Sequence, residues 1–372
     1  MKIVADDKIP FLKGALEQFA EVIYLSGQKI SNEDLKDADA LLTRTRTNCN
    51  ESLLKGSGIR FIGTATIGFD HIDTAYCDKN NIYWTNAPGC NSSSVRQYVA
   101  SALFKVAHEF CFGLRDKTIG IVGVGNVGSK VEKFARSIGM RVLLNDPPRA
   151  RREGSSNFVH LDEILSESDF ITIHVPINLS GEDKTYHFFN SEVFGKMRTG
   201  IWLFNSSRGE VIDTNDLKEA ITSGKLGGAV LDVWENEPHI DLDLMLKAFL
   251  VSPHIAGYSA DGKANGVSMV VNSLCRFFEL PQYNWYPGNV PLPPSPDIFI
   301  ECKGKSEEDI IMEAVFHTYD ISVDDINLRS SPTDFERLRG DYPLRREFPS
   351  YRVILKGNKN VQNILKEIGF RV

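Results

Sequence analysis

The glycine-rich stretch GVGNVG, Gly123 to Gly128, constrains the fold of this chain more than any other feature. It follows the apolar run TIGIV and precedes SKVEKFARSIG, whose apolar residues recur at helical spacing. A strand, a GxGxxG turn and a helix in this order begin a βαβ unit, and the glycines permit a tight turn, close approach of a pyrophosphate and close helix packing. This context predicts a dinucleotide-binding site at Gly123, Gly125 and Gly128, with free amides of the helix start facing the diphosphate.

The next apolar run, RVLLN, ends at Asp146, 18 residues after Gly128. A carboxylate at this position can accept hydrogen bonds from the adenosine ribose hydroxyls and repels a 2′-phosphate, so we expect the cofactor to be NAD. Arginines follow at positions 149, 151 and 152. An arginine there can accommodate the 2′-phosphate of NADP, but we prefer to interpret these three as a solvated basic loop.

Short apolar runs alternate with helical patterns along most of the chain. The runs are KIVAD, EVIYL, ALLT, IRFIGTAT and NIYWT in the first part, with the helical pattern PFLKGALEQF after the first of them, and TIGIVG, RVLLND, FITIHVP, GIWLFNSS, GAVLDVW and FLVSPHIAG in the second. Runs rich in Val and Ile are typical of buried parallel strands that helices cover on both faces. The predicted fold class is therefore α/β, with two Rossmann-like, doubly wound parallel-sheet lobes.

Two further helical patterns, at 94–110 and roughly 266–279, would connect these lobes, and the stiff, proline-rich YPGNVPLPPSP follows them. The predicted parts are a discontinuous substrate lobe of residues 1–95 and 258–285, an NAD-binding domain of residues 96–257, a linker of residues 286–296, and a small α+β dimerisation domain of residues 297–372. We expect the last part to be separate, so that the NAD-binding core folds without it and the chain forms a homodimer through it.

Composition excludes several classes of protein. The chain has 372 residues, 42% of them apolar and 24% charged, and its net charge of −7 predicts no broad basic surface for nucleic acid. No apolar stretch is long enough to span a membrane and no signal peptide is evident, so we expect a soluble protein. Six scattered cysteines without zinc spacing, and the lack of HExxH or an EF-hand loop, predict a cytoplasmic protein without a metal.

Three polar motifs each follow a predicted strand of the second series. They are NSSRGE around Arg208, DVWENEP around Glu237 and SPHIAGY around His254. Parallel sheets place ligands at the carboxyl ends of their strands. Hydride transfer from a hydroxy acid needs a cation for the carboxylate, a base for the hydroxyl proton and a group that tunes the base. Arg208, His254 and Glu237 supply these three, and we predict that they are catalytic.

Two arginines follow the apolar run LLT near the start of the chain. Arg44 and Arg46 would lie on the same side of an extended strand and could converge on one anion, although a solvated strand end is the simpler interpretation. We expect this anion to be one of the substrate's own charged groups. We also expect the chain to turn at Arg44, which we favour over Arg46, and we keep Arg345 and Arg346 as rivals that reach the site across a dimer.

With these motifs the chain resembles the D-isomer-specific 2-hydroxyacid dehydrogenases over residues 1 to about 285. NSSRGE, DVWENEP and SPHIAG resemble the arginine, glutamate and histidine motifs of that family. The resemblance implies that Arg208 holds the substrate carboxylate and the C2 oxygen, that His254 is the general acid and base, and that Glu237 orients and tunes His254. Gln97 departs from the family, in which an acidic residue is usual at this position.

The same resemblance implies the remaining contacts. Those with NAD are Asn126, Val127, Asp146, Val175, Ser206, Ser207, Arg208, Asp232 and Gly257. Those with the substrate are Thr45, Thr66 and Tyr258. The terminal extension with EAVFHTYDI resembles a branch of the family that acts on a small phosphorylated hydroxy acid. This resemblance implies that the anion expected at Arg44 is the phosphate at the far end of the substrate. Two alternatives stay open, namely another 2-hydroxyacid dehydrogenase, such as one acting on 3-phosphoglycerate, and an NAD-responsive corepressor of the same fold that binds partner peptides.

Overall fold

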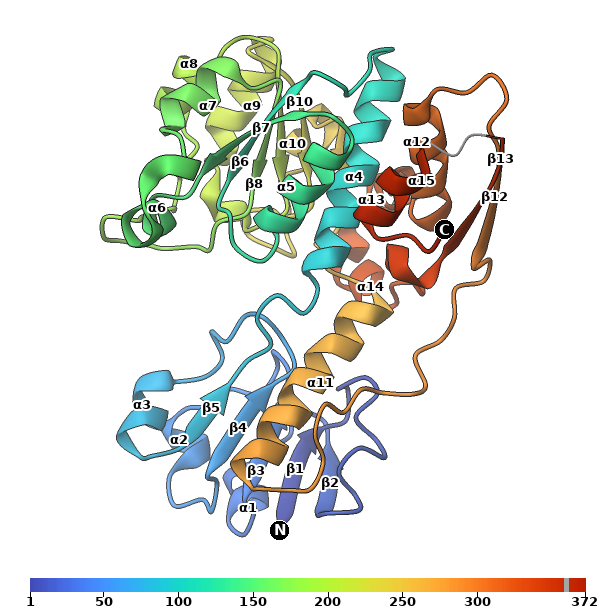
Figure 1. Cartoon of the computed structure of the whole chain (residues 1–372). Helices are drawn as coiled ribbons and strands as arrows, with labels where there is room; N and C mark the ends of the chain where they lie inside the picture. Colours follow the sequence, from blue (N-terminus) through green and yellow to red (C-terminus); the bar gives the residue numbers. More distant parts are fainter. Residues whose placement is uncertain (358–360) are drawn as a thin grey trace. The chain divides into compact units, whose positions relative to one another are not determined.

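The computed structural model describes residues 1–357 and 361–372. It consists of two compact units, one formed by Met1–Asn91 with Ser259–Pro291 and the other by Ser92–Tyr258 with Leu292–Val372 (Figure 1). Each unit contains its own parallel sheet with helices on both faces, which confirms the predicted α/β class. Within the described residues, no helix combines the length and apolar composition needed to cross a membrane.

The first unit contains a five-stranded parallel sheet with the order β2-β1-β3-β4-β5. Its strands are β1 (Lys2–Asp6), β2 (Glu21–Leu25), β3 (Ala40–Thr43), β4 (Phe61–Thr64) and β5 (Tyr83–Thr85). Its helices are α1 (Asn32–Leu35), α2 (Glu51–Leu54), α3 (Thr74–Lys79) and α11 (Ala260–Phe277). Alternate strand residues face opposite sides: Ile3 packs with Val270 of α11, whereas Val4 packs with Leu35 and Leu54 from the short helices.

The helix predicted for PFLKGALEQF is wrong, since residues 10–19 form successive turns. Phe11 and Gly14 have left-handed φ angles of 63° and 87°, which interrupt a right-handed helix. The carboxylate of Glu17 accepts hydrogen bonds from the amides of Gly14 and Leu16 at 2.9 and 3.1 Å, so it satisfies donors that a helix would have used. The apolar residues of the pattern, including Leu12, are nevertheless buried.

The second unit contains a six-stranded parallel sheet with the order β11-β10-β9-β8-β6-β7. Its strands are β6 (Thr118–Val122), β7 (Arg141–Asn145), β8 (Phe170–Ile173), β9 (Ile201–Asn205), β10 (Leu226–Leu231) and β11 (Leu250–Val251). Its helices up to residue 258 are α4 (Ser92–Glu109), α5 (Gly128–Ser137), α6 (Pro147–Glu153), α7 (Leu161–Glu167), α8 (Ser191–Lys196), α9 (Thr214–Thr222) and α10 (Leu242–Lys247). The strand order reverses at β6, and ligands of such sheets bind at the carboxyl ends beside the reversal.

The C-terminal segment, residues 292–372, packs onto α4 and α5 (Figure 1). It contains the strands β12 (Asp297–Glu301) and β13 (Arg352–Lys356) and the helices α12 (Glu307–Thr318), α13 (Ile321–Ser330), α14 (Phe335–Gly340) and α15 (Val361–Ile368). Ile310 of α12 and Leu365 of α15 belong to the same buried cluster as Leu103 of α4 and Phe134 of α5. Helix α4 is buried on nearly every side, so it needs cover from both the sheet domain and this segment.

This shared core corrects the expected domain organisation. The division falls at residues 91/92 and 258/259, and the chain crosses to the second unit at 291/292, inside the predicted linker. In this division, residues 292–372 group with residues 92–258, whereas the sequence predicts that they form a separate third unit. Because their removal would expose the apolar side of α4, we no longer expect the NAD-binding core to fold without them.

Candidate active site

The glycine loop between β6 and α5 has the geometry of an anion site. Gly123 has a φ of 88°, and a Cβ atom there would lie 2.6 Å from the carbonyl oxygen of His174. A Cβ atom on Gly128 would lie 2.1 Å from the carbonyl oxygen of Gly123, so the turn and the helix start both exclude side chains. A Cβ atom on Gly125 would meet nothing within 4 Å. The surrounding protein does not require a glycine at this position, which fits space kept clear for a ligand.

The amino end of α5 presents donors toward this space. The amides of Asn126, Val127 and Gly128 donate to no acceptor in the part of the chain that the structure describes. Unpaired amides at a helix start and the positive end of the helix dipole attract phosphate groups. The loop can therefore hold the diphosphate of a dinucleotide, as the sequence predicts.

Asp146 connects the end of β7 to the glycine loop. Its Oδ2 atom accepts a hydrogen bond from the amide of Val124 at 2.8 Å, and its Oδ1 atom accepts one from the amide of Arg149 at 2.9 Å. Each carboxylate oxygen can accept a second hydrogen bond, so both remain able to bind ribose hydroxyls. The side chain is therefore held at the position that the dinucleotide fingerprint requires.

The three arginines after Asp146 are already engaged with carboxylates. Arg149 and Arg152 both pair with Glu153, and these contacts lower the pKa of Glu153 to about 2. Arg151 pairs with two acidic residues of the loop after β8, Glu182 and Asp183. These pairs favour our interpretation of a solvated loop and leave the NADP alternative without an uncommitted cation here.

We expect Asp146→Ala to reduce the preference for NAD over NADP by about 10–100-fold, the effect of losing a hydrogen bond to a charged group. The ratio of the two kcat/KM values measures this preference. Asp146→Asn is the matched variant, because asparagine still caps α6 and accepts a hydrogen bond but does not repel a 2′-phosphate. An unchanged ratio in both variants would show that another residue selects the cofactor.

His254, in the loop after β11, lies against the side chain of Glu237. Its Nδ1 atom is 2.8 Å from Oε2 of Glu237, and Oε1 of Glu237 accepts a hydrogen bond from the amide of Trp234 at 3.0 Å. The carboxylate therefore favours the tautomer with the proton on Nδ1 and leaves Nε2 for a ligand. His254 also has a left-handed φ of 56°, which is uncommon outside glycine and must be maintained by neighbouring contacts.

Asp232 supplies several of these contacts. Its Oδ1 atom accepts hydrogen bonds from the hydroxyl of Ser252 at 2.6 Å and the amide of Ile255 at 2.7 Å. Its Oδ2 atom accepts one from the amide of Ala256 at 2.9 Å, and its backbone carbonyl accepts the amide of His254 at 2.7 Å. The side chain is only 1% exposed, so its evident role is to hold the loop that carries His254. The predicted contact with the cofactor would have to use the remaining acceptor position on Oδ2.

Arg208, Glu237 and His254 line one pocket of about 280 Å³ in the second unit. Arg208 lies in the turn that follows β9. The side chain of Asn205 holds this turn, because its oxygen accepts hydrogen bonds from the amide and hydroxyl of Ser207 at 3.0 and 2.8 Å. Its nitrogen donates to the carbonyl of Arg208 at 2.9 Å. The three residues that we predicted to be catalytic are therefore neighbours. Tyr186, Glu210 and Glu235 also line this pocket and were not predicted from the sequence.

The other predicted cofactor contacts lie outside this pocket. Ser206 has a buried hydroxyl that finds no hydrogen-bond partner among the described residues, which suits a ligand contact. Val175 is half-buried after β8, with its side chain near the position that a Cβ atom of Gly123 would occupy. Gly257 follows the histidine loop. Tyr258, which is a predicted substrate contact, has its ring 5.9 Å from that of Tyr342 in the C-terminal segment.

The predicted substrate contacts Arg44, Thr45 and Thr66 belong to the first unit. Strands β3 and β4 are paired with Thr43 opposite Thr64, so Arg44 and Thr66 follow adjacent strand ends. Arg44 is half-buried and donates from Nη1 to the carbonyl of Lys8 at 3.2 Å. Because β3 ends at Thr43 and the chain turns at Thr45 and Arg46, the interpretation of Arg44 and Arg46 as neighbours on one side of an extended strand is wrong.

The prediction that Arg345 and Arg346 reach the active site of another subunit is also wrong. Their exposed fractions are 5% and 8%, so both are buried in their own chain. The guanidinium of Arg345 donates to the carbonyl oxygen of Ala256, next to the loop that carries His254. The sequence contained no local signal for this contact, because 89 residues separate its two partners.

Two family models match the chain. The NAD-binding domain of the D-isomer specific 2-hydroxyacid dehydrogenases matches residues 92–256, and a domain family of unknown function matches residues 292–369. The first match contains the glycine loop and the pocket. The second coincides with the C-terminal segment.

Curated relatives match over nearly the whole chain. Erythronate-4-phosphate dehydrogenase from Bacteroides fragilis is 51% identical over 357 residues, which cover 95% of this chain and 99% of the relative. The Proteus mirabilis protein of the same name is 40% identical and covers 100% of this chain and 99% of its own. These relatives include the C-terminal segment.

Solved structures of other dehydrogenases have the same fold. NAD⁺-bound 3-phosphoglycerate dehydrogenase from Entamoeba histolytica is 26% identical, with a TM-score of 0.62, and the match covers 78% of this chain and 98% of that one. D-lactate dehydrogenase from Aquifex aeolicus, in complex with NAD and lactic acid, is also 26% identical, with a TM-score of 0.58 and coverage of 75% and 96%.

Proposed function

This chain belongs to the erythronate-4-phosphate dehydrogenases of the D-isomer-specific 2-hydroxyacid dehydrogenase family, and we propose that it oxidises 4-phospho-D-erythronate with NAD. The products are (R)-3-hydroxy-2-oxo-4-phosphooxybutanoate, NADH and a proton. This reaction is a step toward pyridoxal 5′-phosphate, the active form of vitamin B6. The observation that carries the proposal is the single pocket that contains Arg208, Glu237 and His254.

The chemistry follows from the positions of these side chains. Arg208 binds the substrate carboxylate and the C2 oxygen through its planar guanidinium. His254 takes the hydroxyl proton on Nε2, because Nδ1 is hydrogen-bonded to Glu237. Glu237 keeps the ring oriented and stabilises its positive charge after proton transfer. NAD, held at the glycine loop and Asp146, supplies the acceptor for the hydride from C2.

A panel of substrates tests this proposal. The purified full chain is incubated with NAD and with 4-phospho-D-erythronate, D-erythronate or 3-phosphoglycerate, and NADH is followed by absorbance. We expect the highest kcat/KM for 4-phospho-D-erythronate. Preference for 3-phosphoglycerate would identify another member of the family, and NAD-dependent peptide binding without any turnover would support the corepressor alternative.

We propose that Arg44 binds the substrate phosphate, because Arg208 is committed to the carboxylate at the reacting end. Arg44→Ala should lower kcat/KM for 4-phospho-D-erythronate by about 1.5–3 kcal/mol, or about 10–150-fold, the range for hydrogen bonds to charged groups. The value for unphosphorylated D-erythronate should change little.

The matched control for this variant is Arg60→Ala, which removes another arginine of the first unit that forms an exposed ion pair with Asp39. We expect it to leave both substrates unaffected. Equal losses on both substrates in Arg44→Ala would contradict the phosphate role and indicate that Arg44 binds the carboxylate or supports the loop.

We also propose a homodimer in the cytoplasm. The C-terminal segment carries large apolar side chains on its surface, which a second copy of the chain would cover. The most exposed are Leu292 (74%), Phe299 (73%), Ile326 (62%) and Val323 (56%). Sedimentation of the full chain measures the oligomeric state. A cytoplasmic location fits the supply of NAD and the buried thiols of Cys49 and Cys77.

A further inference from the structure

The carbonyl oxygen of Ala256 joins three segments of the second unit. It accepts hydrogen bonds from the hydroxyl of Ser94 on α4, at 2.9 Å, and from Nη2 of Arg345 in the C-terminal segment. The amide of the same residue donates to Asp232 at 2.9 Å. Residue 256 is therefore held on its amide side by the sheet domain and on its carbonyl side by α4 and the C-terminal segment.

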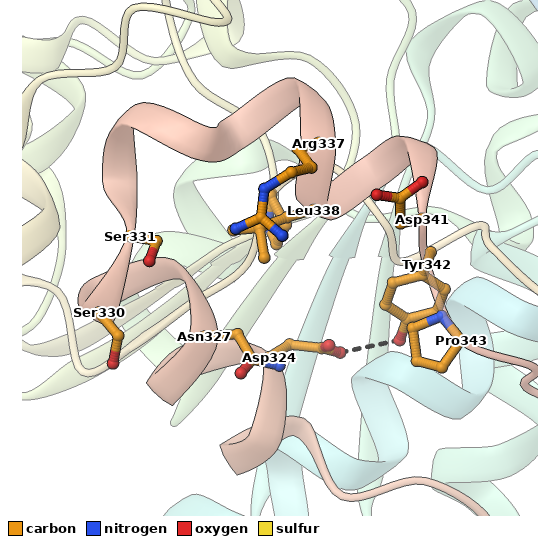
Figure 2. A pocket seen from close by; sticks show the side chains of 10 residues that line it. Asp324, Asn327, Ser330, Ser331, Arg337, Leu338, Asp341, Tyr342 and Pro343 are labelled. Atoms are coloured by element: carbon orange, nitrogen blue, oxygen red, sulfur yellow. Dashed lines mark hydrogen bonds between the residues drawn. The ribbon is translucent and has the colours of Figure 1, made fainter.

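Arg345 is held in place by a buried polar network. Its guanidinium lies over the ring of Tyr319, with 4.4 Å from Cζ to the ring centroid, and 5.8 Å from that of Tyr342. The hydroxyls of both tyrosines donate to Oδ2 of Asp324, at 2.7 and 2.9 Å, and Figure 2 shows the bond from Tyr342. One carboxylate thus fixes both rings around the guanidinium. The Nη2 atom of Arg345 is hydrogen-bonded, whereas its Nε and Nη1 atoms have no hydrogen-bond partner among the described residues.

The same network borders a cavity next to the loop that carries His254. Pro253, the residue before His254, lines a cavity of about 300 Å³ together with residues of the C-terminal segment. Figure 2 shows Asp324 and Tyr342 among these residues. Beyond the loop, the ring of Tyr342 also contacts that of Tyr258, the predicted substrate contact. The C-terminal segment therefore shares a cavity with the start of the stretch from residue 253 to 258, donates a hydrogen bond to Ala256 near its middle and contacts Tyr258 at its end.

Helix α4 anchors the segment beside this stretch. The buried side-chain amide of Gln97 donates to Oγ1 of Thr318 at 2.9 Å and to the carbonyl of Arg346 at 3.0 Å. An acidic residue at position 97 has no donor for these two acceptors. The departure of Gln97 from the wider family thus coincides with the presence of the C-terminal segment.

We propose that the C-terminal segment orients the reactive histidine of its own chain and that Arg345 is the positioning residue. This inference rests on the proposed function and assigns a role to the domain of unknown function matched at residues 292–369. His254 has a left-handed backbone conformation, which persists only where the surroundings determine it. Asp232 accepts hydrogen bonds from the amides of Ile255 and Ala256, and Arg345 donates to the carbonyl oxygen of Ala256. Loss of either side chain would therefore let the ring of His254 leave its productive position.

Arg345→Met tests this role, because methionine is also long and unbranched but has no donor and no charge. NADH formation from 4-phospho-D-erythronate is followed in a single turnover by stopped flow. The amplitude reports the fraction of competent enzyme and the rate reports hydride transfer. We expect the rate to fall about 10–100-fold, the effect of a displacement near 1 Å, while the amplitude and the Kd for NAD remain near those of the unmodified chain. Arg345→Lys, which retains a donor, should recover part of the rate.

The control is Arg352→Met, which removes an exposed arginine of β13 that pairs with Asp297 and should keep the original rate. A reduced amplitude with an unchanged rate in Arg345→Met would overturn the proposal and leave a purely structural role. If Arg345→Met does not fold, Arg345→Lys tests the proposal in its place. We then expect the single-turnover rate of Arg345→Lys to be a few fold to tenfold lower than that of the unmodified chain. A rate equal to that of the unmodified chain would contradict the proposal.

Failure of the proposed function has a different signature, because the unmodified chain itself would then form no NADH. In that case the ring of His254 is followed by proton NMR, with its signal assigned from a His254→Gln sample. We expect its chemical shift to differ between the unmodified chain and Arg345→Met. Identical spectra would reject the positioning role whatever the substrate is.

Discussion

His254→Gln is expected to slow hydride transfer by about 10²–10⁴-fold, the usual contribution of a general base, while the Kd for NAD stays nearly unchanged. Glutamine is polar and of similar size, but it cannot accept the hydroxyl proton at neutral pH. The proposed dinucleotide contacts at the glycine loop and Asp146 do not involve this ring. Stopped-flow NADH formation and NAD titration by fluorescence measure the two quantities.

The control for this variant is His160→Gln, which changes an exposed histidine at the amino end of α7 whose side chain makes no capping bond. It should leave both quantities unaffected. A rate for His254→Gln within a few fold of the original would assign proton transfer to another group in the pocket, and Tyr186 would be the next residue to change.

Asp232→Ala is expected to lower the free energy of unfolding of the second unit by about 3–5 kcal/mol. The substitution leaves three buried donors without their acceptor, those of Ser252, Ile255 and Ala256. Activity should fall with stability, because the same bonds hold the loop that carries His254. Chemical unfolding followed by the near-ultraviolet signal of the tryptophans, together with the single-turnover rate, measures both effects.

Asp243→Ala is the matched control, since Asp243 is a surface carboxylate of the same unit that pairs with Lys247 on α10. We expect its effect to stay within about 0.5 kcal/mol. If Asp232→Ala were as stable as this control and lost only affinity for NAD, Asp232 would be a cofactor contact, as the family resemblance implies, and not a support of the histidine loop.

Local sequence signals predicted the parts of this protein that local physics controls. The GVGNVG loop requires glycine at 123 and 128 because backbone atoms occupy the space of a Cβ. Most of the apolar runs became buried parallel strands, whereas EVIYL and NIYWT form the partly exposed edge strands β2 and β5. Such requirements act within a few residues, so they can be recognised in a single sequence. The pattern at residues 10–19 shows the limit, because burial periodicity predicted a helix that the left-handed residues Phe11 and Gly14 exclude.

The sequence alone thus determined the class of fold, the strand series, the dinucleotide loop and the three motifs whose side chains line the pocket. The tertiary structure decided which distant residues support them, including Asp232 beneath the histidine loop and Arg345 at the carbonyl of Ala256. It also decided that residues 292–372 share a core with α4. The physical reason is that a short motif specifies backbone shape and side-chain chemistry, whereas the partner of a buried group depends on packing between segments far apart in the chain.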